Sequence, residues 1–325
     1  MTVYLLRRLF QAFGVVLAMS VLVFVGVYGI GNPIDILISP DADQIERERA
    51  IRALGLDRPL WEQYWWFLVN ALQGDLGRSF AYNEPALQII LQRMPATLEL
   101  AFGAMILAIV IGLPLGLYAG LYPNSPLSKG IMAGSILGFS LPTFWVGLML
   151  IMLFAVHLGW LPSNGRGATA ELLGVQWSFL TANGLSHLAM PAFNLALFKI
   201  SLVIRLTRAG VRETMLMDYV KFARAKGLSP RRVTFVHVLK NILIPVVTVT
   251  GLELGGTIAF SVVTETVFSW PGMGKLIIDS INRLDRPVMV AYLMIIVLMF
   301  VVINLVVDIV YTMLDPRVRL EAKPA

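Results

Sequence analysis

Two ionisable side chains lie inside long apolar runs, where a charge is costly. Glu253 is near the middle of the run 242–264, and Lys199 is inside the run 185–206. A charge at the centre of a membrane helix costs on the order of 2.5–3.5 kcal/mol to insert, so each group should face protein or water. Glu253 could line a cavity, where its carboxylate would hold an ammonium group of a ligand. Alternatively, it forms a structural pair with Lys199 or a buried hydroxyl, or packs between helices as a neutral acid.

The rest of the sequence contains no motif that is typical of a catalytic, metal-binding or nucleotide-binding site. The three histidines, at positions 157, 187 and 237, have no metal-ligand spacing, and the sequence contains no cysteine. The run Gly272-Met273-Gly274-Lys275 lacks both the first glycine of a phosphate-binding loop and the Ser or Thr after its lysine. There is no nucleophile elbow and no zincin motif. We therefore expect no catalytic residue, no metal site and no nucleotide site in this chain.

The composition is that of an integral membrane protein. Of the 325 residues, 57% are hydrophobic and only 14% are charged, against about a quarter charged in soluble domains. The mean hydropathy is +0.76. The net charge of +6 is concentrated in one loop and near the termini, which indicates membrane topology and not a nucleic-acid partner.

Hydrophobic runs predict an all-α polytopic protein with six transmembrane helices. The third run is interrupted at Leu141-Pro142-Thr143, where we expect a bend, and Gly112, Gly116 and Gly120 should let the second helix pack closely on a neighbour. Basic residues near both ends and in the loop 207–241 place the two termini and that loop in the cytoplasm. The predicted spans are 9–30, 96–121, 130–158, 185–206, 242–264 and 288–311. They give an N-terminal helix (1–30), an extracytoplasmic helical insertion (31–95), a transmembrane domain (96–312) and a cytoplasmic tail (313–325).

The insertion carries an unusual concentration of aromatic residues. Helical spacing predicts helices over 43–54 and 60–73, and the second contains Trp61, Tyr64, Trp65, Trp66 and Phe67. This pattern favours a helix at the level of the lipid headgroups, or one that packs on a partner.

The loop between the fourth and fifth runs has the strongest charge asymmetry, with nine Lys or Arg and two acidic residues between positions 205 and 240. A short helix is predicted over Asp218–Ala225, with Gly227 closing it in the left-handed conformation. Ser229 then caps a second helix that begins at Pro230 and runs towards Lys240. A helix–glycine turn–helix unit is suited to a groove on a partner protein. The alternative is a basic loop held by anionic lipid.

This loop resembles the coupling loop of binding-protein-dependent ABC importer permeases, in the version found in the peptide/nickel family. The resemblance rests on Asp218-Tyr219-Val220 followed by the run 223–228 and by Leu239. Lys221, Phe222, His237 and Lys240 depart from the general pattern. The runs 55–60, 74–79 and 264–275 also resemble that family, so the likeness extends from about residue 6 to residue 319.

The resemblance implies a type I ABC importer fold and a role for each matching segment. The residues that would couple to an ATPase subunit are Asp218, Tyr219, Ala223, Ala225, Lys226, Gly227, Leu228 and Leu239. The turn with Trp270, Pro271, Gly272 and Gly274 would face the delivered ligand or its receptor outside the cell. Independently of the resemblance, its position inside an apolar run makes Glu253 the candidate pathway residue, which would hold a peptide's amino terminus.

As a function, the resemblance implies one permease subunit of an ATP-driven peptide importer in a bacterial inner membrane. The expected partners are a second homologous permease, two ATPase subunits that bind ATP and Mg²⁺, an extracytoplasmic substrate-binding protein and membrane lipid. This chain itself would bind no cofactor and catalyse no reaction. Nickel chelates, opines or oligosaccharides are alternative substrates, and an ATP-independent secondary transporter or channel is the alternative from a different class.

Overall fold

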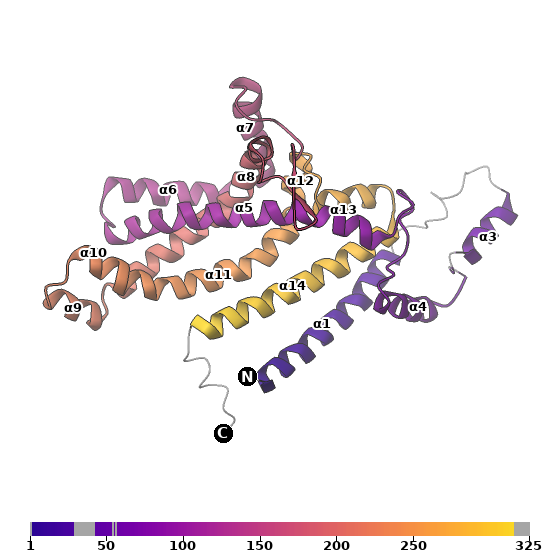
Figure 1. Ribbon diagram of the computed structural model, residues 1–325, viewed down its shortest axis with the longest axis horizontal. Helices are drawn as coiled ribbons and strands as arrows, with labels where there is room; N and C mark the ends of the chain where they lie inside the picture. The colour runs from indigo at the N-terminus through magenta and orange to yellow at the C-terminus, as the bar shows by residue number, and fades with distance from the viewer. Residues whose placement is uncertain (1, 29–42, 54, 56, 315–325) are drawn as a thin grey trace. The chain divides into compact units, whose positions relative to one another are not determined.

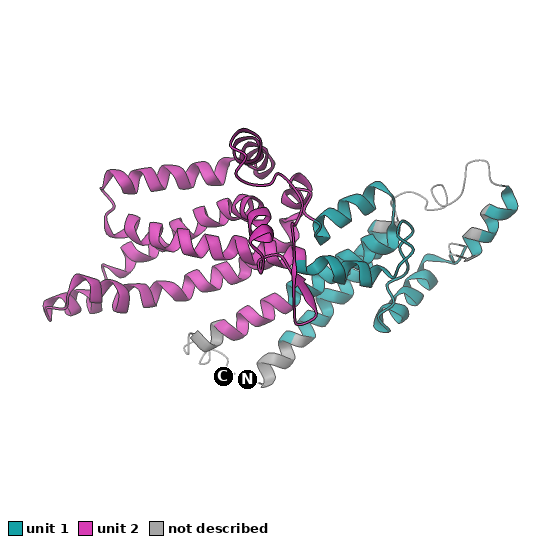
Figure 2. Cartoon of the chain, turned by 45° about the horizontal axis from the view of Figure 1, so that its top comes forward, with its two compact units in different colours: residues 1–95, 271–301 teal, residues 96–270, 302–325 magenta. Residues whose placement is uncertain are grey.

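The computed structural model describes residues 2–28, 43–53, 55 and 57–314, and the chain divides into two units (Figures 1 and 2). Unit 1 comprises residues 1–95 and 271–301, and unit 2 comprises 96–270 and 302–325. The end of the predicted first span, the start of the insertion and most of the predicted tail lie outside the described residues. The predicted four-part division of the chain stays a prediction.

Unit 1 contains α1 (Thr2–Tyr28), α3 (Gln44–Ala53), α4 (Leu60–Leu72), α13 (Met273–Asn282) and the first parts of α5 (Ala86–Leu121) and α14 (Arg286–Leu314). A buried carboxylate organises the segment that precedes α5. Asp285 accepts hydrogen bonds from the Ser79 hydroxyl and from the backbone N–H of Phe80 and Ala81, the latter two at 3.0 and 3.2 Å. The predicted helix 60–73 is confirmed as α4 to within one residue.

Unit 2 is built on the packing of α5 against the long helix α8 (Ala182–Thr214). An added Cβ at Gly112, Gly116 or Gly120 would approach Val203, Thr207 or Val211 of α8 to within 2.5–2.8 Å. Only glycine allows the two backbones to come so close, which confirms the packing role predicted for these three positions. The other elements are α6 (Pro126–Ser140), α7 (Thr143–Leu150), η1 (Ile151–His157), β1 (Ala170–Leu172), β2 (Val175–Trp177), α9 (Asp218–Ala225), α10 (Pro230–Arg232), η2 (Val233–Val238), α11 (Leu239–Phe260) and α12 (Val262–Val267).

The interruption predicted at Leu141-Pro142-Thr143 in the third span, 130–158, is confirmed, and it divides this run into two helices. The helix α6 ends at Ser140, and its axis makes an angle of 107° with the helix that runs from Thr143 to His157. Leu141 is extended, with ψ of 134°, as expected for a residue before proline, and Pro142 cannot donate the backbone hydrogen bond that would continue α6.

Fewer spans are identified among the described residues than the sequence predicts. Four helices are long and apolar enough to cross a membrane, and the bent pair would make five. Within α1, only Phe10–Gly26 is found as an apolar helix, which is shorter than a span. The count of six spans stays a prediction.

A small β-hairpin interrupts the otherwise helical fold, which the all-α prediction did not include. Strands β1 and β2 pair antiparallel with Leu172 opposite Val175. The loop around them is fixed to α5 by Glu99, whose side chain is fully buried. Glu99 accepts hydrogen bonds from Arg166 Nε at 2.9 Å and from the hydroxyl and backbone N–H of Ser178.

Candidate functional site

The helix–turn–helix unit predicted in the basic loop is present at the predicted residues. Helix α9 spans Asp218–Ala225, and Gly227 follows it with φ of +77°. The N–H of Gly227 donates to the carbonyl of Arg224 at 2.9 Å, and that of Leu228 to the carbonyl of Ala223 at 3.3 Å. This pair of bonds is the Schellman motif, which needs a left-handed residue at the position of Gly227.

The second helix starts as predicted but is not a separate element. The Ser229 hydroxyl accepts a hydrogen bond from Arg232 N–H, and Pro230 occupies the first helical position. From Pro230 the chain stays helical through η2 and α11 to Phe260. The segment after the turn is therefore the end of a helix that is long and apolar enough to cross a membrane, so a force on the turn acts directly on that helix.

One face of α9 is packed into the core of unit 2. Val220 and Ala223 are buried in the same apolar cluster as Val211 of α8, Val233 of η2 and Ile242 of α11. The short helix is thus held against the adjoining ends of both long helices that it connects. We call α9, the turn at Gly227, α10 and η2 the coupling hairpin, after the role predicted for it.

The opposite face of the coupling hairpin combines exposed apolar side chains with basic ones. Phe222 is 61% exposed, and the ammonium of Lys226 lies 4.5 Å from the centre of its ring. Exposed apolar residues on a charged loop are typical of a protein-binding surface. The exposed apolar residues of the hairpin are Tyr219, Phe222, Phe235 and Val236, and Leu216 and Met217 are exposed just before α9. The exposed basic residues are Lys221, Arg224, Lys226, Arg231 and Arg232.

The eight residues predicted for coupling fall into two groups. Ala223 is buried, and Leu228 and Leu239 are half-buried, so these three support the hairpin from inside. The exposed group comprises Asp218, Tyr219, Ala225, Lys226 and Gly227.

Phe222, Phe235 and Val236 were not predicted from the sequence as surface candidates. Phe222 is three residues after Tyr219, so both lie on the same side of α9. That spacing was the available signal. Phe235 and Val236 belong to the π-helical segment η2, whose spacing of side chains sequence periodicity does not reveal.

One ion pair lies on the hairpin itself. Lys221 donates a hydrogen bond of 2.9 Å to Asp218, which is the first residue of α9. This hydrogen bond and the positive charge of Lys221 hold the pKa of Asp218 below its ordinary value of 3.8. The carboxylate also lies at the helix N-terminus, where a negative charge is favourable.

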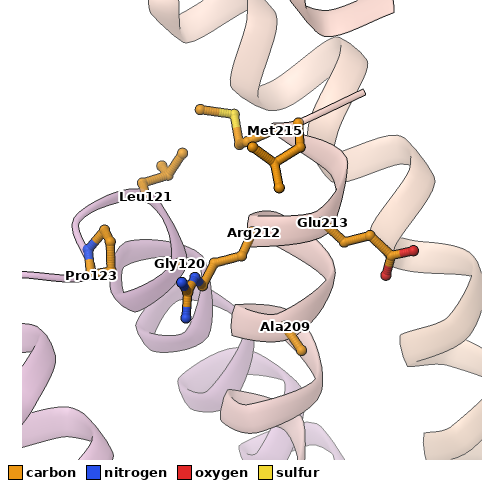
Figure 3. A pocket seen from close by; sticks show the side chains of 8 residues that line it. Gly120, Leu121, Pro123, Ala209, Arg212, Glu213 and Met215 are labelled. Carbon is orange, nitrogen blue, oxygen red and sulfur yellow. The ribbon is translucent and has the colours of Figure 1, made fainter. Parts of the chain in front are cut away.

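An open groove adjoins the hairpin where α5 and α8 end (Figure 3). Its volume is about 490 Å³. In Figure 3, the guanidinium of Arg212 lies on the side of Gly120 and Pro123, and the carboxylate of Glu213 points away from them. The groove is lined by Gly120, Leu121, Pro123, Ala209, Arg212, Glu213, Met215 and Leu216.

Lys199 and Glu253 form an ion pair between α8 and α11. Of the alternatives for Glu253, the structural pair with Lys199 is therefore present. The side chain of Glu253 is nevertheless 36% exposed, against 12% for Lys199. Lys199 precedes Thr214, the last residue of α8, by fifteen residues, and Glu253 follows Leu239, the first residue of α11, by fourteen, or about 22 and 21 Å at 1.5 Å per residue. The pair thus joins, at one level, the two helices that the coupling hairpin connects.

The turn that was predicted to face a receptor is largely buried. The indole of Trp270 has no exposed surface, and its N–H donates to the carbonyl of Ala96 at 2.8 Å. Gly272 and Gly274 are also buried, and Pro271 is half-buried. The Trp270 side chain therefore packs inside the chain and faces no solvent in this conformation. That another part of this turn contacts a receptor stays a prediction.

Comparison with known families accounts for most of the chain. Residues 112–320 match the family model described as binding-protein-dependent transport system inner membrane component, and residues 1–101 match the model for the N-terminal part of such components. The chain belongs to this family. Its members are inner-membrane proteins, so this chain is an integral inner-membrane permease subunit.

Individual relatives agree with that assignment. The chain is 41% identical over 304 residues to the di/tripeptide transport system permease protein DppB of Pseudomonas aeruginosa, covering 89% of this chain and 90% of that protein. It is 38% identical over 321 residues to the oligopeptide transport system permease protein AppB of Bacillus subtilis, covering 98% of this chain and all of that protein.

A solved structure supports the predicted fold. The inward-facing MetNI methionine ABC transporter matches with a TM-score of 0.55 at 17% identity, covering 70% of this chain and 97% of the matched chain. At this identity, the likeness concerns the fold alone. The fold is that of a type I ABC importer permease, as predicted.

Proposed function

We propose that this permease subunit forms half of the translocation pathway of an ATP-driven importer for peptides. The peptide substrate is supported by the relatives, which are named for di/tripeptide and oligopeptide transport. The coupling hairpin carries the proposal for the ATP-driven step. It presents Phe222 and Tyr219 outward from a helix whose other face is fixed to two long helices.

The complete transporter contains a second homologous permease, two ATPase subunits with ATP and Mg²⁺, and a substrate-binding protein outside the membrane. Both termini and the coupling hairpin lie in the cytoplasm. The groove beside Arg212 extends the surface available to an ATPase subunit. Closure of the ATPase pair moves the hairpin, and because η2 continues into α11, the movement reaches the level of Glu253.

The pathway residue in this proposal is Glu253. Because its carboxylate is partly exposed, the amino terminus of a peptide can replace the ammonium of Lys199 as its partner. Glu253→Gln should reduce transport of peptides with a free amino terminus more than that of N-acetylated peptides, each supplied bound to the receptor protein. Equal losses for both kinds of peptide would leave Glu253 with a structural role only.

The decisive experiment is uptake by the reconstituted complex. Proteoliposomes with both permeases, the ATPases and the receptor are given peptides, nickel chelates, opines and oligosaccharides, with ATP or with ADP. We expect peptides to be taken up in the presence of ATP and not in the presence of ADP. Uptake of another class of compound would show that the substrate is not a peptide. Uptake without ATP would identify a secondary transporter or channel.

A further inference from the structure

Helix α4 has three distinct faces, and one of them binds α1. The ring of Phe24 in α1 lies 5.3 Å from the ring of Tyr64 and 5.9 Å from that of Phe67. The hydroxyls of Ser20 and Tyr64 are hydrogen-bonded at 2.8 Å. Ser20 and Phe24 are both buried. The contact therefore fixes α4 to α1, beside the C-terminal part of that helix (Figure 1).

A second face of α4 is an apolar strip that nothing in the described chain covers. Trp61 is 70% exposed, Trp65 64% and Leu72 88%. Residues four and eleven positions apart fall on one side of an α-helix, so the three side chains form a continuous strip. Glu62 and Asn70 lie on the remaining side, together with Trp66, which is 52% exposed. This division into apolar and polar faces is typical of helices that lie in a membrane surface.

The contact with α1 sets the level of the strip. Ser20 and Phe24 precede Tyr28, the end of α1, by eight and four residues, or about 12 and 6 Å along the helix. At the same level of α1, Leu22 and Val25 are 64% and 62% exposed, as expected of side chains in contact with lipid. Lipid that reaches these residues also reaches the neighbouring strip.

We infer that α4 lies in the membrane–water interface, with the strip formed by Trp61, Trp65 and Leu72 inserted among lipids. Tryptophan favours this region because its ring is apolar and its N–H can reach polar headgroups. The guanidinium of Arg58 lies 5.8 Å from the ring centre of Trp66 on the adjacent side, where it would meet lipid phosphates. The occupant is lipid and not a protein partner. This inference does not depend on what the transporter carries.

Single-cysteine spin labelling tests the inference, because the sequence contains no cysteine. Trp65→Cys and Leu72→Cys report on the strip, and Asn70→Cys is the matched control on the polar face of the same helix. Each variant is labelled in the complete transporter in nanodiscs, and collision rates are measured with oxygen, which enters lipid, and with a water-soluble nickel chelate.

The labels on the strip should collide with oxygen several-fold more than with the nickel chelate, and the label at position 70 should show the reverse. Dominant nickel collisions at positions 65 and 72 would place the strip in water. Low collision rates with both reagents would mean that a protein covers it. Either result overturns the inference. Retained transport by each variant shows that the helix is still in its native place.

Discussion

Two glycine turns of this chain were predicted from the sequence to meet partner molecules, one an ATPase subunit and the other the delivered ligand or its receptor, and their surroundings differ. At Gly227 the turn is exposed, and Phe222 beside it is 61% exposed. At Trp270 the side chain is fully buried, and the backbone N–H donates to the carbonyl of Glu265 at 2.8 Å. A segment that resembles its family can therefore be a surface in one place and a core contact in another. Burial separates the two.

Breaking the exposed turn should have the largest effect on transport. In Gly227→Pro, the φ of +77° becomes inaccessible and the hydrogen bond to Arg224 is lost. We expect ATP-driven uptake to be abolished while membrane insertion is retained. The measurement is uptake by proteoliposomes together with the yield of inserted protein.

The matched control is Gly174→Pro in the β-hairpin, where φ is +76°. The strain on the backbone is similar, but the coupling hairpin is untouched, so uptake should continue. Normal transport by Gly227→Pro would contradict the coupling role.

Removing the buried tryptophan should mainly lower stability. Trp270→Ala leaves a large cavity and a carbonyl of Ala96 without its indole donor. The expected cost is about 3–5 kcal/mol in the free energy of unfolding. Thermal unfolding of the purified complex measures it. If the unfolding temperature of the variant is unchanged and its binding to the receptor is weaker, the Trp270 side chain faces the receptor and is not a core residue.

The exposed aromatic residue should behave in the opposite way. Phe222→Ala removes no buried contact, so the unfolding temperature should stay the same. Affinity for the ATPase subunits should fall by about 1–2 kcal/mol, roughly 5–30-fold. Titration of the permease pair with ATPase subunits measures this loss. A loss of stability without a loss of affinity would assign Phe222 to the core.

The smallest effect is expected at Asp218. Its pKa is lowered in the folded state, so its contribution to stability is present above the ordinary value of 3.8 and is lost as the pH falls through the lowered pKa. The group is fully exposed and its pairing with Lys221 is screened by solvent. Asp218→Asn should slightly lower the unfolding temperature at neutral pH and leave it unchanged well below pH 3.8. A difference that persists in acid would exclude the ion pair as its cause.

The parts of the fold that were predictable depend on local interactions. The bounds of α9, the left-handed Gly227 and the cap at Ser229 follow from residues within a few positions of one another. Likewise, Gly112, Gly116 and Gly120 could be identified as a packing face by spacing alone, although their partners on α8 could not.

What the sequence did not reveal depends on distant residues. The burial of Trp270 requires Ala96, which is 174 positions away. Proline at position 142 predicts a bend but not its angle of 107°. The choice among roles for Glu253 required the position of Lys199, 54 positions away on another helix.

The central claim is that the coupling hairpin contacts an ATPase subunit, and cross-linking from its surface tests that contact directly. A benzophenone attached to Phe222→Cys, the sole cysteine of the chain, is irradiated in the complete transporter. Trp160→Cys, at a residue that is 69% exposed in a loop remote from the hairpin in sequence, is the control. We predict that the probe at position 222 forms an adduct with the ATPase subunit, and that the yield of this adduct changes when ATP is added. The probe at position 160 should form no adduct with the ATPase subunit. Adducts from position 222 with lipid alone would contradict the account.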